Sequence, residues 1–265
     1  MIFFRLNTWV LISLLVLIIG GLSFLGLLAG RRLHHPEALK GPVGVVQGSL
    51  LGLVALLLAF GLAMAVDRFE ERRSLVVREA DDIGTTYLRA QTLTEPARSR
   101  SLALLKDYAD VAIALANQVP RSARFEASRT LIASLQRRLW TEAGVALAAD
   151  PIGNASRLYV ESLNPMFDVH ADRVASLRNL VPTPVLLLEI IGSAVALAVL
   201  AMYLSMIGRG IGITVVAALF VIFILFVSFD LDRPKRGYIR VPSTPLEDTR
   251  ALMDLPPAVP AVSLG

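Results

Sequence analysis

Hydrophobic positions along this chain of 265 residues gather into four long runs separated by polar sequence. The runs cover residues 6–29, 42–66, 183–207 and 211–229. A helix needs about 20 mostly apolar residues to cross a bilayer, because each residue adds a rise of about 1.5 Å. Backbone polar groups in hydrocarbon must be bonded within their own segment, so each run is predicted to be a transmembrane helix. The first run is too long for a signal peptide and lacks a good cleavage site, so we expect it to remain as an anchor.

The polar block between the second and third runs, residues 67–182, has helical periodicity throughout. The second membrane helix is predicted to continue to about Thr92, and Thr94 to cap a next helix that ends near Asn117. Ser122 is expected to open a further helix, and a last one spans residues 154–180. The helix that Ser122 opens has an apolar stripe at three- and four-residue steps, namely Phe125, Leu131, Leu135, Leu139 and Trp140.

No segment alternates as a strand does, so the predicted fold is an all-α membrane protein with four transmembrane helices. Its regions are residues 1–66 with the first two spans, 67–182 as a helical cytoplasmic domain, 183–229 with the last two spans, and 230–265 as a cytoplasmic tail. The tail is rich in proline beyond Val241, and the final ten residues are expected to be disordered.

Composition narrows the chemistry further: 55 % of the residues are hydrophobic, 18 % are charged, and the net charge is +4. The absence of cysteine excludes a disulfide scaffold, a thiolate metal site and a cysteine nucleophile. Only three histidines occur, and the adjacent His34 and His35 are expected to be exposed polar residues without a metal. No nucleophile, zinc or phosphate-binding motif is found, so we predict no enzyme, no cofactor and no metal. The modest charge gives no indication of nucleic-acid binding.

Basic residues near the membrane ends predict the orientation of the chain. Eleven Lys or Arg residues flank the membrane on the side of the termini and the polar block, against four on the other side. Both termini and residues 67–182 are therefore predicted to be cytoplasmic, in a bacterial inner membrane. Arg31 and Arg32 lie in a short loop on the opposite side and argue for the reverse orientation, in which the block would resemble a periplasmic sensory domain.

The second run carries residues at four-residue steps that share one helical face. They are Gly44, Gly48, Gly52, Leu56, Phe60 and Met64. One interpretation is ordinary packing within a subunit, because small residues let helix backbones approach closely. The other is that the stripe lines a symmetric axis, with the glycines at the mouth and the larger residues as apolar rings that gate by dewetting.

Glu189 is the one acid inside an apolar run, about 10 Å from the start of its helix at helical rise. An intramembrane acid is costly and usually marks a partner or an ion pathway. The alternative is an acid near enough to the interface to reach water or a basic residue.

Three stretches of sequence carry a resemblance to a known family. Residues 58–73, which include Phe60, resemble the bestrophin segment that leads from a hydrophobic neck into an Asp-Arg-aromatic-x-Glu-x-Arg helix. The matching positions are Asp67, Arg68, Phe69, Glu71 and Arg73. From Gly44 onward the chain resembles the bacterial four-span bestrophin-like family, most specifically at residues 79–90 and 230–241, the latter with Asp230, Asp232 and Arg233.

The resemblance implies a homo-oligomer, pentameric in bestrophins, whose second helix lines a central pore with neck rings at Gly52, Leu56 and Phe60. Gly52 departs from the bulky residue that is usual there, and Glu70 replaces the second aromatic of a Trp-Trp pair. The acidic cluster that holds calcium in animal members has no counterpart, so the resemblance implies no metal.

We therefore predict an oligomeric channel that conducts small inorganic ions through an apolar neck in the lipid bilayer. The alternative is a non-conducting receptor or scaffold with a helical sensory domain. A membrane enzyme would require Asp230 and Asp232 to act at the interface without a supporting histidine or cysteine.

Overall fold

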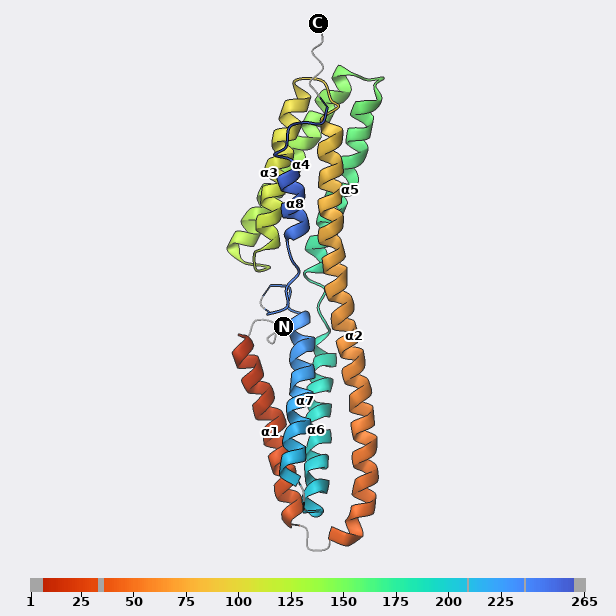
Figure 1. Ribbon diagram of the computed structural model, residues 1–265, viewed down its shortest axis with the longest axis vertical. Helices are drawn as coiled ribbons and strands as arrows, with labels where there is room; N and C mark the ends of the chain where they lie inside the picture. The colour runs from red at the N-terminus through yellow and green to blue at the C-terminus, as the bar shows by residue number, and fades with distance from the viewer. Residues whose placement is uncertain (1–6, 33–35, 209, 236, 260–265) are drawn as a thin grey trace. The chain divides into compact units, whose positions relative to one another are not determined.

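The structure is a computed structural model that describes residues 7–32, 36–208, 210–235 and 237–259, and these residues form helices and no strand (Figure 1). In chain order the helices are α1 (Thr8–Arg32), α2 (Pro36–Ala90), α3 (Ala97–Ala116), α4 (Ala123–Ala149), α5 (Asn154–Ser176), α6 (Thr183–Met206), α7 (Gly210–Leu231) and α8 (Thr244–Leu252). Helices α1, α2, α6 and α7 are long and apolar enough to cross a membrane. The predicted all-α fold with four membrane-length helices is confirmed.

Helix ends differ from the prediction at two places and agree with it at a third. Thr94 is not the cap of α3, which begins at Ala97 after Pro96 and has no side-chain cap. Helix α5 ends at Ser176, four residues before the predicted end. The prediction at Ser122 is confirmed, because its hydroxyl accepts a hydrogen bond from the Phe125 N–H at 3.2 Å, as an N-cap does.

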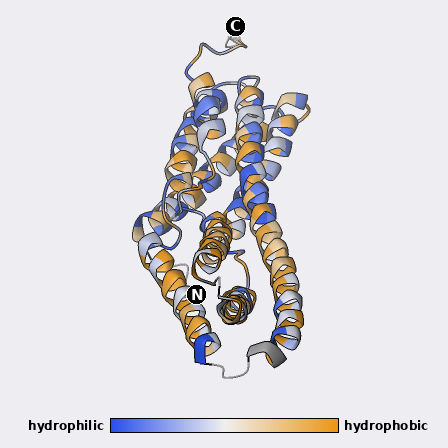
Figure 2. Cartoon of the chain, turned by 60° about the horizontal axis from the view of Figure 1, so that its bottom comes forward, coloured by the Kyte–Doolittle hydropathy of each residue, from blue (hydrophilic) through white to orange (hydrophobic). Residues whose placement is uncertain are grey.

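The chain divides into two compact units. We call residues 1–69 with 180–240 the membrane unit, and residues 70–179 with 241–265 the polar unit. Helix α2 contributes its apolar stretch to the first and its charged stretch to the second. Figure 2 shows this change of hydropathy along α2. The cytoplasmic placement of residues 67–182 stays a prediction.

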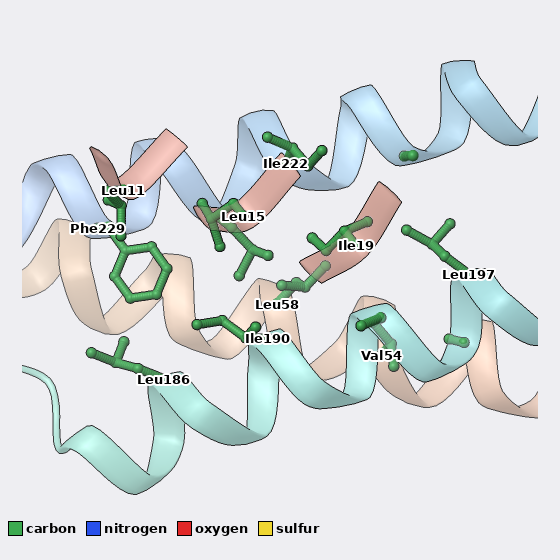
Figure 3. Packing of buried hydrophobic residues seen from close by; sticks show 14 of the residues in the cluster. Leu11, Leu15, Ile19, Val54, Leu58, Leu186, Ile190, Leu197, Ile222 and Phe229 are labelled. Atoms are coloured by element: carbon green, nitrogen blue, oxygen red, sulfur yellow. The ribbon is translucent and has the colours of Figure 1, made fainter. Parts of the chain in front are cut away.

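Within the membrane unit, α6 is the central helix. Half of its most apolar window is buried, against 28 % for α1 and 22 % for both α2 and α7. Figure 3 shows side chains of α1, α2, α6 and α7 meeting in one core. Its largest members are Leu11, Leu15, Ile19, Leu58, Leu186, Ile190, Leu197, Leu200, Ile222, Leu225 and Phe229. The other three helices consequently keep broad apolar faces uncovered within the chain.

Close contact between α1 and α6 depends on two glycines. A Cβ at Gly26 would overlap the backbone carbonyl of Ala198, and one at Gly30 would lie 2.5 Å from the carbonyl oxygen of Met202. Such close helix approach through small residues is a common way to associate helices in a membrane, where apolar burial alone gives little advantage over lipid.

The polar unit has its own core between α3, α4, α5, α8 and the charged part of α2. Its largest fully buried side chains are Tyr108, Tyr159, Ile83, Leu105, Leu115, Ile132, Leu139 and Leu163. The predicted stripe of α4 is wrong at Leu131 and Trp140, which are about half exposed. Ile132 takes the buried position beside Leu135, and the Trp140 ring lies against Phe167 with centroids 6.4 Å apart.

The tail beyond Val241 is more ordered than the sequence indicates. It contains α8, and the Tyr87 hydroxyl donates a hydrogen bond of 2.9 Å to the carbonyl of Met253. The Val259 N–H donates to the Gln91 side chain at 3.2 Å, and Arg98 donates to the Val259 carbonyl at 2.6 Å. These contacts reach Val259, the last residue described, and residues 260–265 lie outside the described part of the chain, so the disorder of the final ten residues stays a prediction.

Candidate functional site

Helix α2 presents two opposite faces in the membrane unit. Val54, Leu58, Gly61 and Ala65 are buried against the rest of the unit. Residues two positions apart lie about 200° apart around a helix with 3.6 residues per turn, so Leu56 and Phe60 point the other way from Leu58. Their side chains are 53 % and 60 % exposed, and Gly52 is exposed on the same face. The predicted neck positions therefore lie on an uncovered face of the chain.

Packing within the chain accounts for only part of the glycine stripe. A Cβ at Gly48 or Gly52 would meet no atom within 4 Å, whereas one at Gly44 would lie 3.2 Å from the Tyr203 ring. At the other end of the stripe, Met64 packs against the core of the membrane unit. Gly44 and Met64 thus serve packing inside one chain, and nothing described inside this chain covers the positions between them.

Glu189 lies on α6 behind this part of α2. Its side chain is 3 % exposed, and a Cβ on Gly61 would overlap its carboxylate. Its Oε1 has no hydrogen-bond partner among the described residues. The side chain of Glu189 is therefore directed at the α2 backbone next to Phe60, and it does not reach the surface of the unit.

The Asp-Arg-aromatic segment of α2 is mostly accessible. Asp67, Glu71 and Arg73 are exposed, and Arg68 and Phe69 are half-buried. Within this segment Arg73 makes an exposed ion pair of 3.5 Å with Glu70. Its most buried residue, at 3 % exposure, is Arg72, which the motif comparison did not single out. Arg72 is flanked by charged residues in the sequence, and nothing in that pattern predicted that its side chain is buried.

The segment after α7 has a structural role that the sequence did not reveal. The Asp230 carboxylate accepts hydrogen bonds from the N–H groups of Tyr238 at 3.1 Å and Ile239 at 2.8 Å. A Cβ at Gly237 would lie 2.7 Å from the same carboxylate, so this position requires glycine. These bonds close the chain into a loop held on a buried carboxylate.

Asp232 joins this loop to the start of α6. Its Oδ2 accepts a hydrogen bond of 2.7 Å from the Val181 N–H, two residues before α6 begins. Asp230, Asp232 and Arg233 are each at most 2 % exposed. Carboxylates that are buried and bonded to backbone N–H groups serve as structural acceptors, and the exposed ring of Tyr238 is a candidate interfacial anchor.

The polar unit contains a buried ionic cluster that the sequence analysis missed. Glu79 on α2 forms an ion pair with Arg173 on α5, and its Oε1 lies 2.7 Å from the His170 Nδ1. Arg173 also donates a 3.4 Å hydrogen bond to the Ala112 carbonyl of α3. Burial alone would raise the pKa of Glu79, but Arg173 and the His170 hydrogen bond hold it below its ordinary value. Burial, with the Glu79 charge, raises the pKa of the adjacent Tyr108.

The cluster had one signal in the sequence, which is that His170 and Arg173 are three residues apart and so share a face of α5. The cluster joins three helices, α2, α3 and α5. Glu79 and its partner His170 are about 90 residues apart in the chain. In the described ranges, no group of three or more His, Asp or Glu residues is placed to hold a metal ion. His34 and His35 lie outside those ranges.

Comparison with known proteins identifies the family and the fold of this chain. The sequence model of the Bestrophin-like domain matches residues 9–246. Crystal structures of two single-residue variants of a bacterial bestrophin homologue from Klebsiella pneumoniae are similar to this chain. One gives a TM-score of 0.66 at 14 % identity over 94 % of this chain and 96 % of that one, and the other gives 0.62 at 15 % identity over 90 % and 96 %.

A further crystal structure, described as that of a membrane protein, gives a TM-score of 0.64 at 14 % identity over 91 % of this chain and 97 % of that one. No curated protein sequence matches. At these low identities the similar structures show only the fold. The domain match covers nearly the whole chain and therefore shows the family. On that match, this chain belongs to the Bestrophin-like family.

Proposed function

We propose that this protein is the subunit of an oligomeric ion channel in the bacterial inner membrane, with the pore lined by the exposed face of α2. The observation that supports this most is the position of Gly52, Leu56 and Phe60. They form a regular stripe at four-residue steps, opposite to the face that packs against the chain's own core. A stripe left uncovered by its own chain is available to face copies of itself around an axis.

Exposure alone does not distinguish a pore from lipid, because α7 also leaves apolar residues uncovered, such as Phe220 at 64 %. Helix α2 differs in its sequence pattern, since glycines at Gly48 and Gly52 leave open space where a bulky side chain would close it. Leu56 and Phe60 then narrow the path as apolar rings. Rings of this kind gate conduction by dewetting: a narrow apolar passage excludes water and therefore ions, and a wider one admits both.

The same geometry supports a homo-oligomer. Closed rotational symmetry is the usual arrangement of soluble homo-oligomers, and it would place the same α2 face of every copy around one axis. Five copies is the number that the bestrophin resemblance implies. The polar unit would then lie on the cytoplasmic side as a vestibule for small inorganic ions, with both termini on that side.

Ion flux from vesicles tests the proposal. The purified protein is reconstituted into lipid vesicles, and ion efflux is compared for wild type, Phe60→Ala and Phe220→Ala. The two phenylalanines are matched in exposure within the membrane unit. We expect wild type to conduct, Phe60→Ala to raise efflux because the apolar ring is widened, and Phe220→Ala to behave as wild type.

Absence of efflux from a correctly assembled wild type, together with no effect of Phe60→Ala, would favour the receptor or scaffold instead. Images of purified particles give the symmetry independently. A closed ring with Gly48 and Gly52 facing inward supports a pore, and a dimer contradicts it.

A further inference from the structure

Two buried polar atoms of α6 have no partner in the membrane unit. The Oε1 of Glu189 and the Oγ of Ser193 make no hydrogen bond to any described residue, and the two residues are 3 % and 0 % exposed. They are four positions apart and therefore lie on one face of α6. A buried polar group without a hydrogen bond costs free energy, so an unpartnered pair on one face calls for a ligand that the chain itself does not supply.

Charged groups on the surrounding helices lie outside the apolar stretches that pack around Glu189. On α1 they are Arg31 and Arg32, at the end of the helix remote from Glu189. The apolar stretch of α2 has none between Lys40 and Asp67, and Arg68, two turns beyond Gly61, makes no ion pair with Glu189. On α7 the first charge is Asp230, whose carboxylate accepts hydrogen bonds from Tyr238 and Ile239.

The chemistry of the ligand follows from the number of oxygens available. A sodium or divalent ion needs about six oxygen ligands, and here one carboxylate and one hydroxyl are present. An isolated carboxylate in hydrocarbon is strongly disfavoured relative to the neutral acid, whereas a proton needs a single oxygen. The site therefore suits a proton and does not suit a metal ion.

We propose that Glu189 is a proton-binding site that sets the position of α2 at the neck. The neutral carboxyl fits against the α2 backbone at Gly61, the residue next to Phe60, and only glycine leaves room for it. Loss of the proton places a charge between α2 and α6 with no described counter-charge. The charge must then draw in water or displace α2, and either change alters the ring at Phe60. This coupling to conduction rests on the proposed channel function.

The proton itself is tested without conduction. A hydrophobic carbodiimide, which reacts with protonated carboxyl groups in apolar surroundings, is applied to the reconstituted full chain at neutral pH, and the adduct is located by mass spectrometry. We expect one adduct, at Glu189, and none in Glu189→Gln. Glu79 is also buried but is paired with Arg173, so we expect it to stay unlabelled and to serve as an internal control. Glu189 that stays unlabelled in the folded protein, although the same reagent labels it once the protein is unfolded in acid, overturns the proposal.

The coupling is tested by ion efflux at pH values on either side of neutrality. Wild-type efflux is expected to change by about fivefold or more, the lower range of coupling between distinct sites. In Glu189→Gln, efflux should lose this response and stay at the wild-type acidic level, because glutamine imitates the neutral acid. A pH response that survives in Glu189→Gln overturns the coupling. If wild type conducts no ions, the channel proposal fails while the labelling result still decides the proton site.

Discussion

The two units of this chain each bury a glutamate, and they treat it in opposite ways. Glu79 in the polar unit is fully buried and contacts Arg173 and His170 from another helix. Glu189 in the membrane unit is also buried, at 3 % exposure, and its Oε1 has no described partner. The first acid holds helices together as a charge, and the second fits its site only as a neutral group. Burial by itself therefore does not show what an acid does, because its partners decide that.

The largest expected effect comes from removing one partner of the polar cluster. Glu79→Ala leaves the Arg173 guanidinium buried at 4 % exposure without its counter-charge. Breaking a buried ion pair in this way costs about 3–5 kcal/mol, and we expect the free energy of unfolding of the polar unit to fall by that amount. Denaturant unfolding of the full-length protein in detergent, followed by circular dichroism, measures the loss. A change below about 1 kcal/mol would show that the cluster is not a structural tie.

Acid should weaken the same unit. The pKa of Glu79 is lowered from its ordinary value of 4.5 by Arg173 and His170, in spite of burial. A carboxyl with a lowered folded-state pKa contributes stability above its unfolded-state value and loses it as the pH falls toward the folded-state value. Unfolding midpoints of the polar unit should therefore drop as the pH falls below about 4.5. The drop should shrink in Glu79→Gln, and an equal drop in that variant would assign the acid sensitivity to other groups.

The membrane unit should respond more to shape than to charge. Gly26→Ala places a methyl group on the backbone carbonyl of Ala198, which cannot move aside as a side chain could. Overpacking of this kind typically costs about 1–3 kcal/mol. Gly21→Ala on the same helix is the matched control, because a Cβ there meets nothing within 4 Å. Thermal unfolding of the two variants in detergent compares them, and equal midpoints would contradict the close α1–α6 contact.

The smallest effect is expected at an exposed ion pair. Arg73 and Glu70 are 3.5 Å apart, and their side chains are 58 % and 54 % exposed. Water and salt screen such pairs, so Arg73→Ala should change the free energy of unfolding by less than about 1 kcal/mol. Measured under the same conditions as Glu79→Ala, it gives the baseline for a charge that is not buried. A loss as large as that of Glu79→Ala would remove the distinction between the two pairs.

The pattern of apolar residues was enough to predict the four membrane-length helices of this fold, but it did not predict α8. Apolar length set the four membrane helices, and a local cap at Ser122 set the start of α4. Local signals misled where packing decided the outcome. Thr94 looked like a cap, yet α3 begins after Pro96. Helix α8 has only nine residues, and residues beyond it are held by partners such as Tyr87 and Arg98 that lie more than 150 residues away in the chain.

At the candidate site, the sequence did not predict which residues contact one another, because those partners are distant in the chain. The four-residue spacing identified the stripe with Leu56 and Phe60, but the uncovered face became visible only when Leu58 and Val54 were seen to be buried. Asp230 and Asp232 were recognised as motif residues, whereas their bonds to backbone N–H groups depend on where distant segments meet. The ion pair of Glu79 was not predicted, because its partner Arg173 is 94 residues away in the chain.

The central claim, that the Phe60 face of α2 lines an ion pathway, is tested most directly by thiol modification. The chain has no cysteine, so Phe60→Cys introduces the only thiol, and Phe220→Cys gives a matched exposed position on α7. Ion efflux from vesicles is recorded before and after a charged, membrane-impermeant thiol reagent is added. The account predicts that the reagent changes efflux through Phe60→Cys and leaves Phe220→Cys unaltered. Efflux through Phe60→Cys that stays the same when its thiol is fully modified would contradict it.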